Sequence, residues 1–181
     1  MRQYRWQSLD EPGFELLEIE EVETGIHARG MVIGDWGEIA SGATYHVTLA
    51  PDWSFRGINL MRLDGTRLRL RADGAGNWTD GTGAPLPELK GCIDIDLSGS
   101  PFTNTLPIRR ARFEPGVPQR FTMAFIALDS FAVSPREQFY TQRDDTHFHY
   151  RSGASGFEAD LETDAGGFVV TYPGLFQRVE N

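Results

Sequence analysis

The sequence predicts an all-β fold made of consecutive hairpins, and three observations support this prediction. Turn-forming residues recur at intervals of roughly ten residues, between short runs rich in β-branched and aromatic side chains. Several of these runs alternate between apolar and polar residues, which is the period of a half-buried strand. Helix signals are scarce. Counting the runs gives roughly a dozen strands.

Four runs define the strands most clearly. Residues 45–49 place their apolar side chains on one face, and residues 67–72 place three arginines on one face and two leucines and an alanine on the other. Residues 157–164 carry four carboxylates on one face. Residues 120–128 are apolar on both faces, which predicts a central or deeply covered strand.

Residues 101–111 are the best candidate for a helix. A threonine or asparagine among residues 103–105 is suited to cap its start, and proline is tolerated in a first turn. Arg109 and Arg110 would then lie near the C-terminal end, where the helix dipole favours cations. Because of Pro107, an extended loop remains the alternative.

Composition excludes several classes of protein. Glycine and proline are spread along all 181 residues, so residues 1–181 are expected to form a single domain. The net charge of −9 argues against nucleic-acid binding, and no apolar run is long enough for a membrane span. The single cysteine, Cys92, excludes an internal disulfide. The first residues lack the apolar core of a signal peptide, so a cytoplasmic location is expected.

Two carboxylates form the most informative candidate site. Asp94 and Asp96 are two residues apart on a predicted strand, so their side chains project in parallel, roughly 6.5 Å apart. Close carboxylates raise one another's pKa, and they can accept sugar hydroxyls or coordinate a hard cation. The alternative is a wet strand face with two solvated aspartates.

Polar and basic residues follow these acids. A turn within residues 103–105 would bring Asn104, Arg109 and Arg110 back toward the two aspartates. Such a cluster would be either a buried ion-pair network or a polar ligand site, and the residues alone favour neither.

Other chemistry has weaker support. His147 and His149 share a strand face but lack further ligands nearby in sequence, so we expect a surface pair and no metal. No nucleotide or cofactor motif is present, and no cofactor is expected. The tryptophans at turns and strand ends are suited either to stacking on sugar rings or to filling the ends of a curved sheet; they are Trp6, Trp36, Trp53 and Trp78.

Two central segments carry a family resemblance. Residues 91–97 (GCIDIDL) and 101–110 (PFTNTLPIRR) resemble the signature of the bacterial putative glycolipid-binding proteins, formerly a domain of unknown function. Gly99-Ser100 stands where that family usually has Ala-Thr, and Ser100 keeps the hydroxyl. The similarity covers nearly the whole chain, through Trp6 with Glu15 and through residues 45–53, 73–78, 138–141 and 168–176.

The resemblance implies a large curved antiparallel sheet wrapped around a single short helix, remotely like the lipoprotein localisation factors, and a homodimer. It also implies an acidic pocket for a glycolipid or another sugar-containing molecule. On this chain we place the pocket at seven ligand-binding residues, which are Asp94, Asp96, Asn104, Arg109, Arg110, Glu15 and Trp78.

Three hypotheses for the function follow. The first is a glycolipid-binding protein of glycolipid metabolism, in which Asp94 and Asp96 accept hydroxyls and an arginine pairs with any phosphate. The second is a hydrolase-like enzyme that uses the paired carboxylates, although two acids on one strand flank a glycosidic bond poorly. The third is an interaction protein whose acids and arginines only stabilise the fold.

Overall fold

The computed structural model describes the backbone of residues 1–36 and 39–179, and the side chains in these ranges apart from residues 36 and 39–41. Within them, fourteen strands form one sheet with the order β7-β6-β5-β4-β3-β2-β1-β14-β13-β12-β11-β10-β9-β8. The first half comprises β1 (Arg2–Ser8), β2 (Gly13–Val22), β3 (Gly25–Trp36), β4 (Ile39–Leu49), β5 (Phe55–Arg62), β6 (Arg67–Ala72) and β7 (Trp78–Asp80). The second comprises β8 (Asp94–Leu97), β9 (Gln119–Ile126), β10 (Val133–Gln142), β11 (His147–Ser152), β12 (Glu158–Thr163), β13 (Val169–Tyr172) and β14 (Phe176–Arg178).

The topology is two meanders that meet in the middle of the sheet. β1 to β7 pair in sequence as hairpins, β9 to β14 do the same, and β1 pairs with β14. Among the described strands, only β8 and β9 pair in parallel; every other pairing is antiparallel. The predicted all-β fold of consecutive hairpins is therefore confirmed, with this one parallel pair added.

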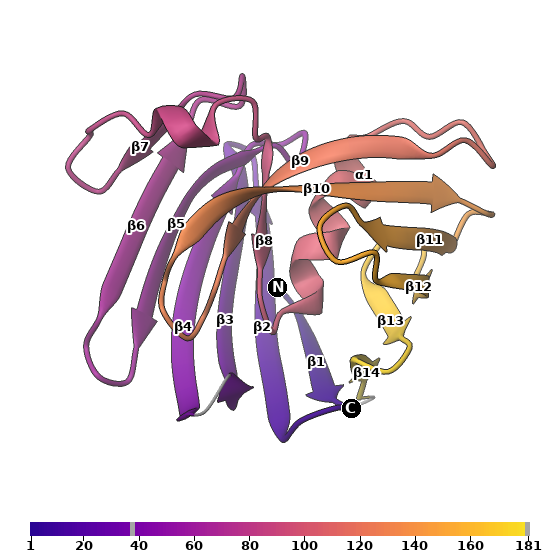
Figure 1. Ribbon diagram of the computed structural model, residues 1–181, viewed down its shortest axis with the longest axis horizontal. Coiled ribbons are helices and arrows are strands. Elements are labelled where there is room, and N and C mark those ends of the chain that lie inside the picture. The colour runs from indigo at the N-terminus through magenta and orange to yellow at the C-terminus, as the bar shows by residue number, and fades with distance from the viewer. Residues whose placement is uncertain (37–38, 180–181) are drawn as a thin grey trace.

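One short helix lies inside the curve of the sheet (Figure 1). A 3-10 turn, η2 (Pro101–Asn104), continues into α1 (Thr105–Arg110), which confirms the helix predicted over residues 101–111. Pro101 occupies the first turn, and both arginines lie in the last. Residues 101–108 are all buried, so the sheet surrounds this segment instead of leaving it an exposed polar face.

The interior contains two apolar clusters, and β8 and β9 lie between them. Ile95 and Leu97 pack into the cluster that fills the first half, whereas Met123 of β9 belongs to the cluster of the second half. Ala124 of β9 packs into the first cluster, so β9 is covered on both faces. This explains why residues 120–128 are apolar throughout.

The two ends of the sheet are tied together by the segment that contains η1 (Pro87–Leu89). The Gly91 amide donates to the Gly76 carbonyl (2.9 Å), and Trp78 Nε1 donates to the Cys92 carbonyl (2.8 Å). Gly76 has a φ of +88°, and a Cβ there would lie 3.0 Å from the Gly91 nitrogen. Glycine is therefore required where these two backbones meet.

Candidate ligand-binding site

β8 positions the two aspartates because its other face is apolar. Ile95 and Leu97 are fully buried in the first cluster. Strand alternation therefore turns Asp94 and Asp96 the other way, toward the second half of the sheet. The structure brings each of them to a different partner.

Asp94 forms an ion pair with Arg110. The Arg110 Nε lies 3.1 Å and 3.2 Å from the two carboxylate oxygens, and Nη2 donates to Oδ2 at 2.6 Å. Asp94 is 1% exposed. Burial raises the pKa of the Asp94 carboxyl, and the Arg110 guanidinium opposes that rise. This is the arrangement of a buried ion pair, in which each charge requires the other.

Asp96 has a polar but uncharged neighbour. Gln138 Nε2 of β10 donates to Asp96 Oδ2 at 2.6 Å, and the Thr103 hydroxyl lies 3.5 Å from Oδ1. Asp96 is half-buried, and in the part of the chain that the structure describes it forms no ion pair with an arginine or lysine. Burial raises the pKa of its carboxyl to about 6, while the Gln138 hydrogen bond and the charge of Arg136 oppose the rise.

Tyr140 extends the hydrogen-bond network of Asp96 and Gln138 into the interior. The Tyr140 hydroxyl donates to Asn104 Oδ1 (2.7 Å) and lies 3.2 Å from Gln138 Oε1. Its ring packs edge-on against Tyr150 at 5.3 Å, and Tyr150 in turn packs against Tyr172 at 6.0 Å. A carboxylate, two amides and a row of tyrosines are the groups that recognise sugar hydroxyls and the apolar faces of sugar rings.

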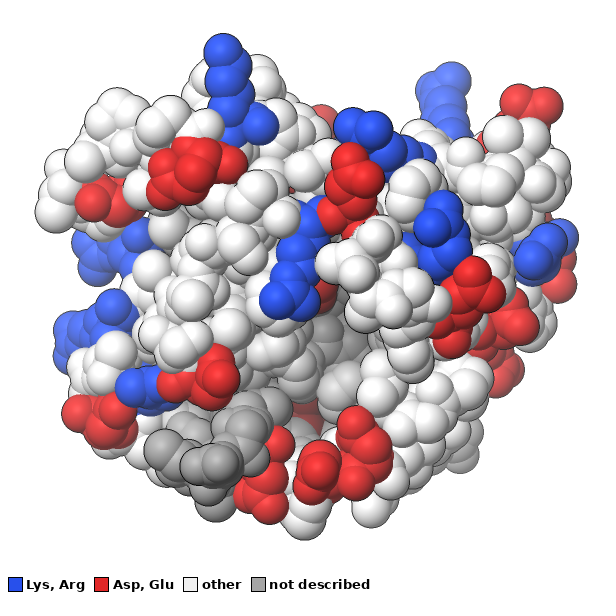
Figure 2. Space-filling model, viewed as in Figure 1, with Lys and Arg blue, Asp and Glu red and all other residues white. Residues whose placement is uncertain are grey.

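The molecule is hollowed near α1. Figure 2 shows the hollow near the centre of this face, with both basic and acidic side chains around it. Phe157 and Phe176 pack against Tyr172 and are partly exposed. The tyrosine cluster therefore reaches the surface through apolar side chains.

Glu15 forms a separate site in the first half. Its Oε1 accepts hydrogen bonds from the Tyr45 hydroxyl (2.5 Å) and the Ser100 hydroxyl (2.6 Å), and Oε2 has no partner among the described residues. Burial raises the pKa of its carboxyl to about 7. Tyr45 lies directly over Gly30, where a Cβ would come 2.1 Å from the ring. Glu15 is thus held by the core and is not linked to Asp94 or Asp96 by a hydrogen bond.

Two other predicted residues also lie elsewhere. Arg109 turns away from the aspartates: it donates to the Gly166 carbonyl at 2.5 Å and stacks over Trp53 at 4.2 Å. Trp78 is buried and stacks on Phe55 at 4.9 Å. Trp6 and Trp53 are buried as well, which agrees with tryptophans that fill the sheet; the side chain of Trp36 lies outside the described residues.

Sequence reasoning missed the residues that complete each site. Gln138 and Tyr140 connect Asp96 to Asn104, and Tyr45 and Ser100 hold Glu15. Alternation places Gln138 and Tyr140 on one face of a strand. It does not reveal that this strand lies beside residues about 40 positions earlier, because that proximity depends on the parallel pairing of β8.

The described ranges, 1–36 and 39–179, contain no group of three histidine, cysteine, aspartate or glutamate side chains arranged to hold a metal ion. None of the helices there is long and apolar enough to cross a membrane.

Comparisons with known proteins support a family assignment. A family model described as "Putative glycolipid-binding" matches residues 3–178. A comparison with curated proteins found no match. Among solved structures, the chain is similar to the crystal structure of a DUF1089 family protein from Pseudomonas aeruginosa. The TM-score is 0.80 and the sequences are 32% identical, and the match covers 92% of each chain.

Proposed function

Because this chain belongs to the family described as putative glycolipid-binding, we propose that it binds a glycolipid, or another sugar-containing amphiphile, in the hollow near α1. Its acidic pocket centres on Asp96 in this proposal. The supporting observation is that Asp96 is a half-buried carboxylate whose partners are an amide and a hydroxyl instead of a cation. Such an oxygen retains the capacity to accept hydrogen bonds from a ligand.

The residues around Asp96 have different roles in this proposed site. Gln138 and Asn104 orient the polar network, and Asp94 with Arg110 fixes the strand and the helix relative to each other. The partly exposed Phe157 and Phe176 provide an apolar surface for an acyl chain. The roles predicted for Glu15, Arg109 and Trp78 stay predictions, since none of the three is joined to this network.

The same geometry favours binding over hydrolysis. Glycosidases place two carboxyl groups on opposite sides of the scissile bond. Asp94 is buried and held by three close contacts with Arg110, so Asp96 is the one carboxylate of this pair with spare accepting capacity. A single carboxylate can position a hydroxyl, but it cannot serve as both acid and base in this mechanism.

The proposed function also concerns the oligomeric state of the protein and its location in the cell. We expect a homodimer in the cytoplasm, taking part in glycolipid synthesis or turnover. The resemblance of residues 91–110 to the family supports the dimer, and the cytoplasmic location stays a prediction.

Two measurements test the binding proposal. Organic extraction of freshly purified protein, followed by mass spectrometry, should release an amphiphile at about one molecule per protomer. Titration of n-octyl β-D-glucoside should show saturable binding that Asp96→Asn weakens about tenfold, as expected for losing a hydrogen bond to a charged group.

Asp160→Asn is the matched control, because Asp160 is an exposed carboxylate that pairs with His149 on the outer side of β12. It should bind like the wild type. An empty extract together with no octyl glucoside binding would overturn the proposal.

A further inference from the structure

The outer side of strands β2 to β6 carries an unusual concentration of exposed apolar side chains. Six large ones lie on this outer β2–β6 face, with exposures from 37% to 87%: Phe14, Leu16, Met31, Ile33, Met61 and Leu63. Both faces of these strands are thus rich in apolar groups, because their inner faces fill the first cluster. A contiguous patch of this kind usually marks an interaction site.

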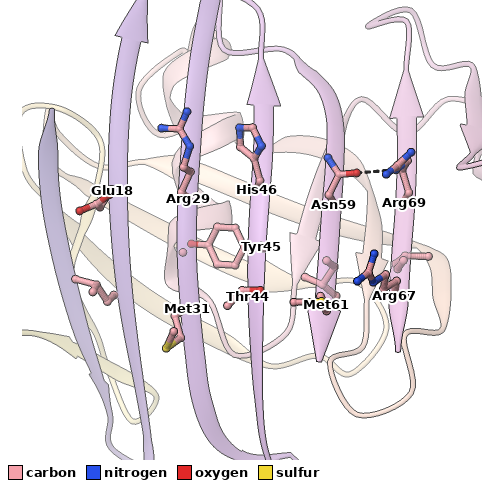
Figure 3. Close-up of a pocket in the computed structure, with 14 residues that line it drawn as sticks. Glu18, Arg29, Met31, Thr44, Tyr45, His46, Asn59, Met61, Arg67 and Arg69 are labelled. Atoms are coloured by element: carbon pink, nitrogen blue, oxygen red, sulfur yellow. Dashed lines mark hydrogen bonds between the residues drawn. The ribbon is translucent and has the colours of Figure 1, made fainter. Parts of the chain in front are cut away.

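The side chains of this face form rows that run across the five strands (Figure 3). In the apolar row Leu16 pairs with Met31, Met31 with Thr44, Thr44 with Met61, and Met61 with Arg67. A groove runs over the middle of these rows and is lined by their side chains.

The next row is polar and runs from an acid to a base. It places Glu18, Arg29, His46, Asn59 and Arg69 in direct register from β2 to β6 (Figure 3). The row beyond it begins with Glu20 on β2 and ends with Arg71 on β6.

Charge is therefore distributed unevenly over the face. Glu18 and Glu20 lie on β2, and Arg67, Arg69 and Arg71 lie on β6, while Arg29 of β3 forms an ion pair with Glu20 at 2.9 Å. In the described part of the chain Arg67, Arg69 and Arg71 form no ion pair, although the protein has a net charge of −9. Arg69 instead donates to Asn59 at 2.7 Å.

A face with an apolar centre, acids on one side and bases on the other is complementary to itself. A two-fold axis parallel to β4, the middle strand, would lay β2 of one copy over β6 of the other. Glu18 would then face Arg69 of the second copy, while the methionines met in the centre; Glu20 keeps its own partner, Arg29. An axis across the strands would set acid against acid, so the charges select the first arrangement.

The size of the face sets how much of it the second copy must cover. Four strand spacings of about 4.8 Å and six residues at about 3.4 Å give a face of roughly 19 Å by 20 Å, or about 400 Å². A standard interface buries ~800 Å² per partner, so the dimer must also cover the parts of β3 and β4 that extend beyond these rows.

We infer that the outer β2–β6 face is the surface on which two copies of this chain associate, sheet against sheet. The inference rests on the homodimer in the proposed function and adds where that dimer forms. The ligand hollow lies on the inner side of the sheet, so association and ligand binding use different residues.

Native mass spectrometry and sedimentation at several concentrations test the inference. The wild type should be a dimer, and Met31→Glu should shift it to a monomer or raise the dimer Kd by at least a hundredfold. Val117→Glu is the control, since Val117 is an exposed apolar residue in a turn outside this face, and it should leave the dimer intact. Circular dichroism and octyl glucoside binding verify that each variant is folded.

A charge-swap pair tests the orientation independently of folding. Glu18→Arg and Arg69→Glu should each weaken self-association about tenfold or more, because each makes the face repel its copy. Mixing the two variants should restore a dimer, a heterodimer with two opposite-charge contacts.

Three outcomes would overturn the inference. These are a wild-type monomer, a Met31→Glu variant that stays dimeric, and a mixture that fails to pair although both single variants are folded. A wild-type monomer would also refute the proposed dimer, whereas the other two results would refute only this surface. None of them bears on ligand binding, which the Asp96→Asn titration tests separately.

Discussion

The two halves of the sheet differ in where they place their polar and apolar groups. The first half, β1 to β7, has an apolar interior that encloses the buried acid Glu15, and its outer face carries a patch of apolar side chains over β2 to β5. The second half, β9 to β14, has an interior that mixes tyrosines with an amide, next to Asp94 and Asp96. Its outer face carries charged pairs such as Arg120 with Glu137. The comparison suggests that one half provides an association surface and the other a ligand site.

The largest loss of stability is expected from breaking the buried ion pair between Asp94 and Arg110. Arg110→Met leaves Asp94 buried without its partner and should cost about 3–5 kcal/mol of unfolding free energy. Arg109→Met, one residue earlier, removes a contact with an exposed backbone carbonyl and a stack on Trp53, and should cost about 1 kcal/mol. Urea melts of both variants compare them. Equal losses would show that Asp94 does not depend on Arg110.

The buried acid of the first half should make stability depend on pH. The pKa of Glu15 is raised from 4.5 to about 7 in the folded protein, so the native state binds more protons than the unfolded chain between these values. The resulting stabilisation is complete below about pH 4.5 and is lost as the pH rises through about 7, a change on the order of 3 kcal/mol.

Glu15→Gln should remove this dependence. The amide resembles the protonated acid and does not titrate. Urea melts from pH 5 to pH 8 on both proteins give the difference directly, since the contribution of Asp96 is common to both. Parallel curves would mean that Glu15 titrates normally.

Removing one tyrosine hydroxyl from the interior of each half shows which interior binds the ligand. Tyr45→Phe removes a donor from Glu15, and Tyr140→Phe removes a donor from Asn104, so each should cost about 1–2 kcal/mol of stability. Binding of octyl glucoside should weaken only in Tyr140→Phe. If both variants bind alike, the inner side of the second half is not the ligand site.

The smallest change in stability is expected from removing an exposed ion pair on the outer face of the second half. Arg120 and Glu137 are both exposed, with a nitrogen–oxygen distance of 3.4 Å. Arg120→Ala should change stability by less than about 0.5 kcal/mol and leave the oligomeric mass unchanged. A change in mass would indicate that this face also takes part in association.

Much of the fold was predictable because its signals are local. The hairpins follow from turn residues and alternation. The helix within residues 101–111 was indicated by its capping residues and its two arginines, although Pro107 left an extended loop as the alternative. The parallel pairing of β8 with β9 was not predictable, because it joins segments separated by the helix and has no turn of its own.

The sequence predicted the two acids of the candidate site together with Asn104 and Arg110, but not the other residues that complete it. Asp94, Asp96 and Arg110 lie within one segment, and the ion pair joins residues 16 positions apart. Gln138 is 42 positions from Asp96 and Ser100 is 85 positions from Glu15, so no spacing rule could connect them. Arg109 and Arg110 are equivalent in the sequence, and only the direction of the last helical turn separates their roles.

The seam between the two meanders has a consequence for folding. Each meander is built from neighbouring hairpins, whose contacts are local and form early, whereas β1 and β14 join the two ends of the chain. Their pairing runs from Arg5 to Leu9 against Leu175 to Val179, and the Trp6 indole donates to the Val169 carbonyl as a further tie. Because this pairing has to wait until the two ends of the chain meet, the seam should close after the hairpins on either side of it have formed.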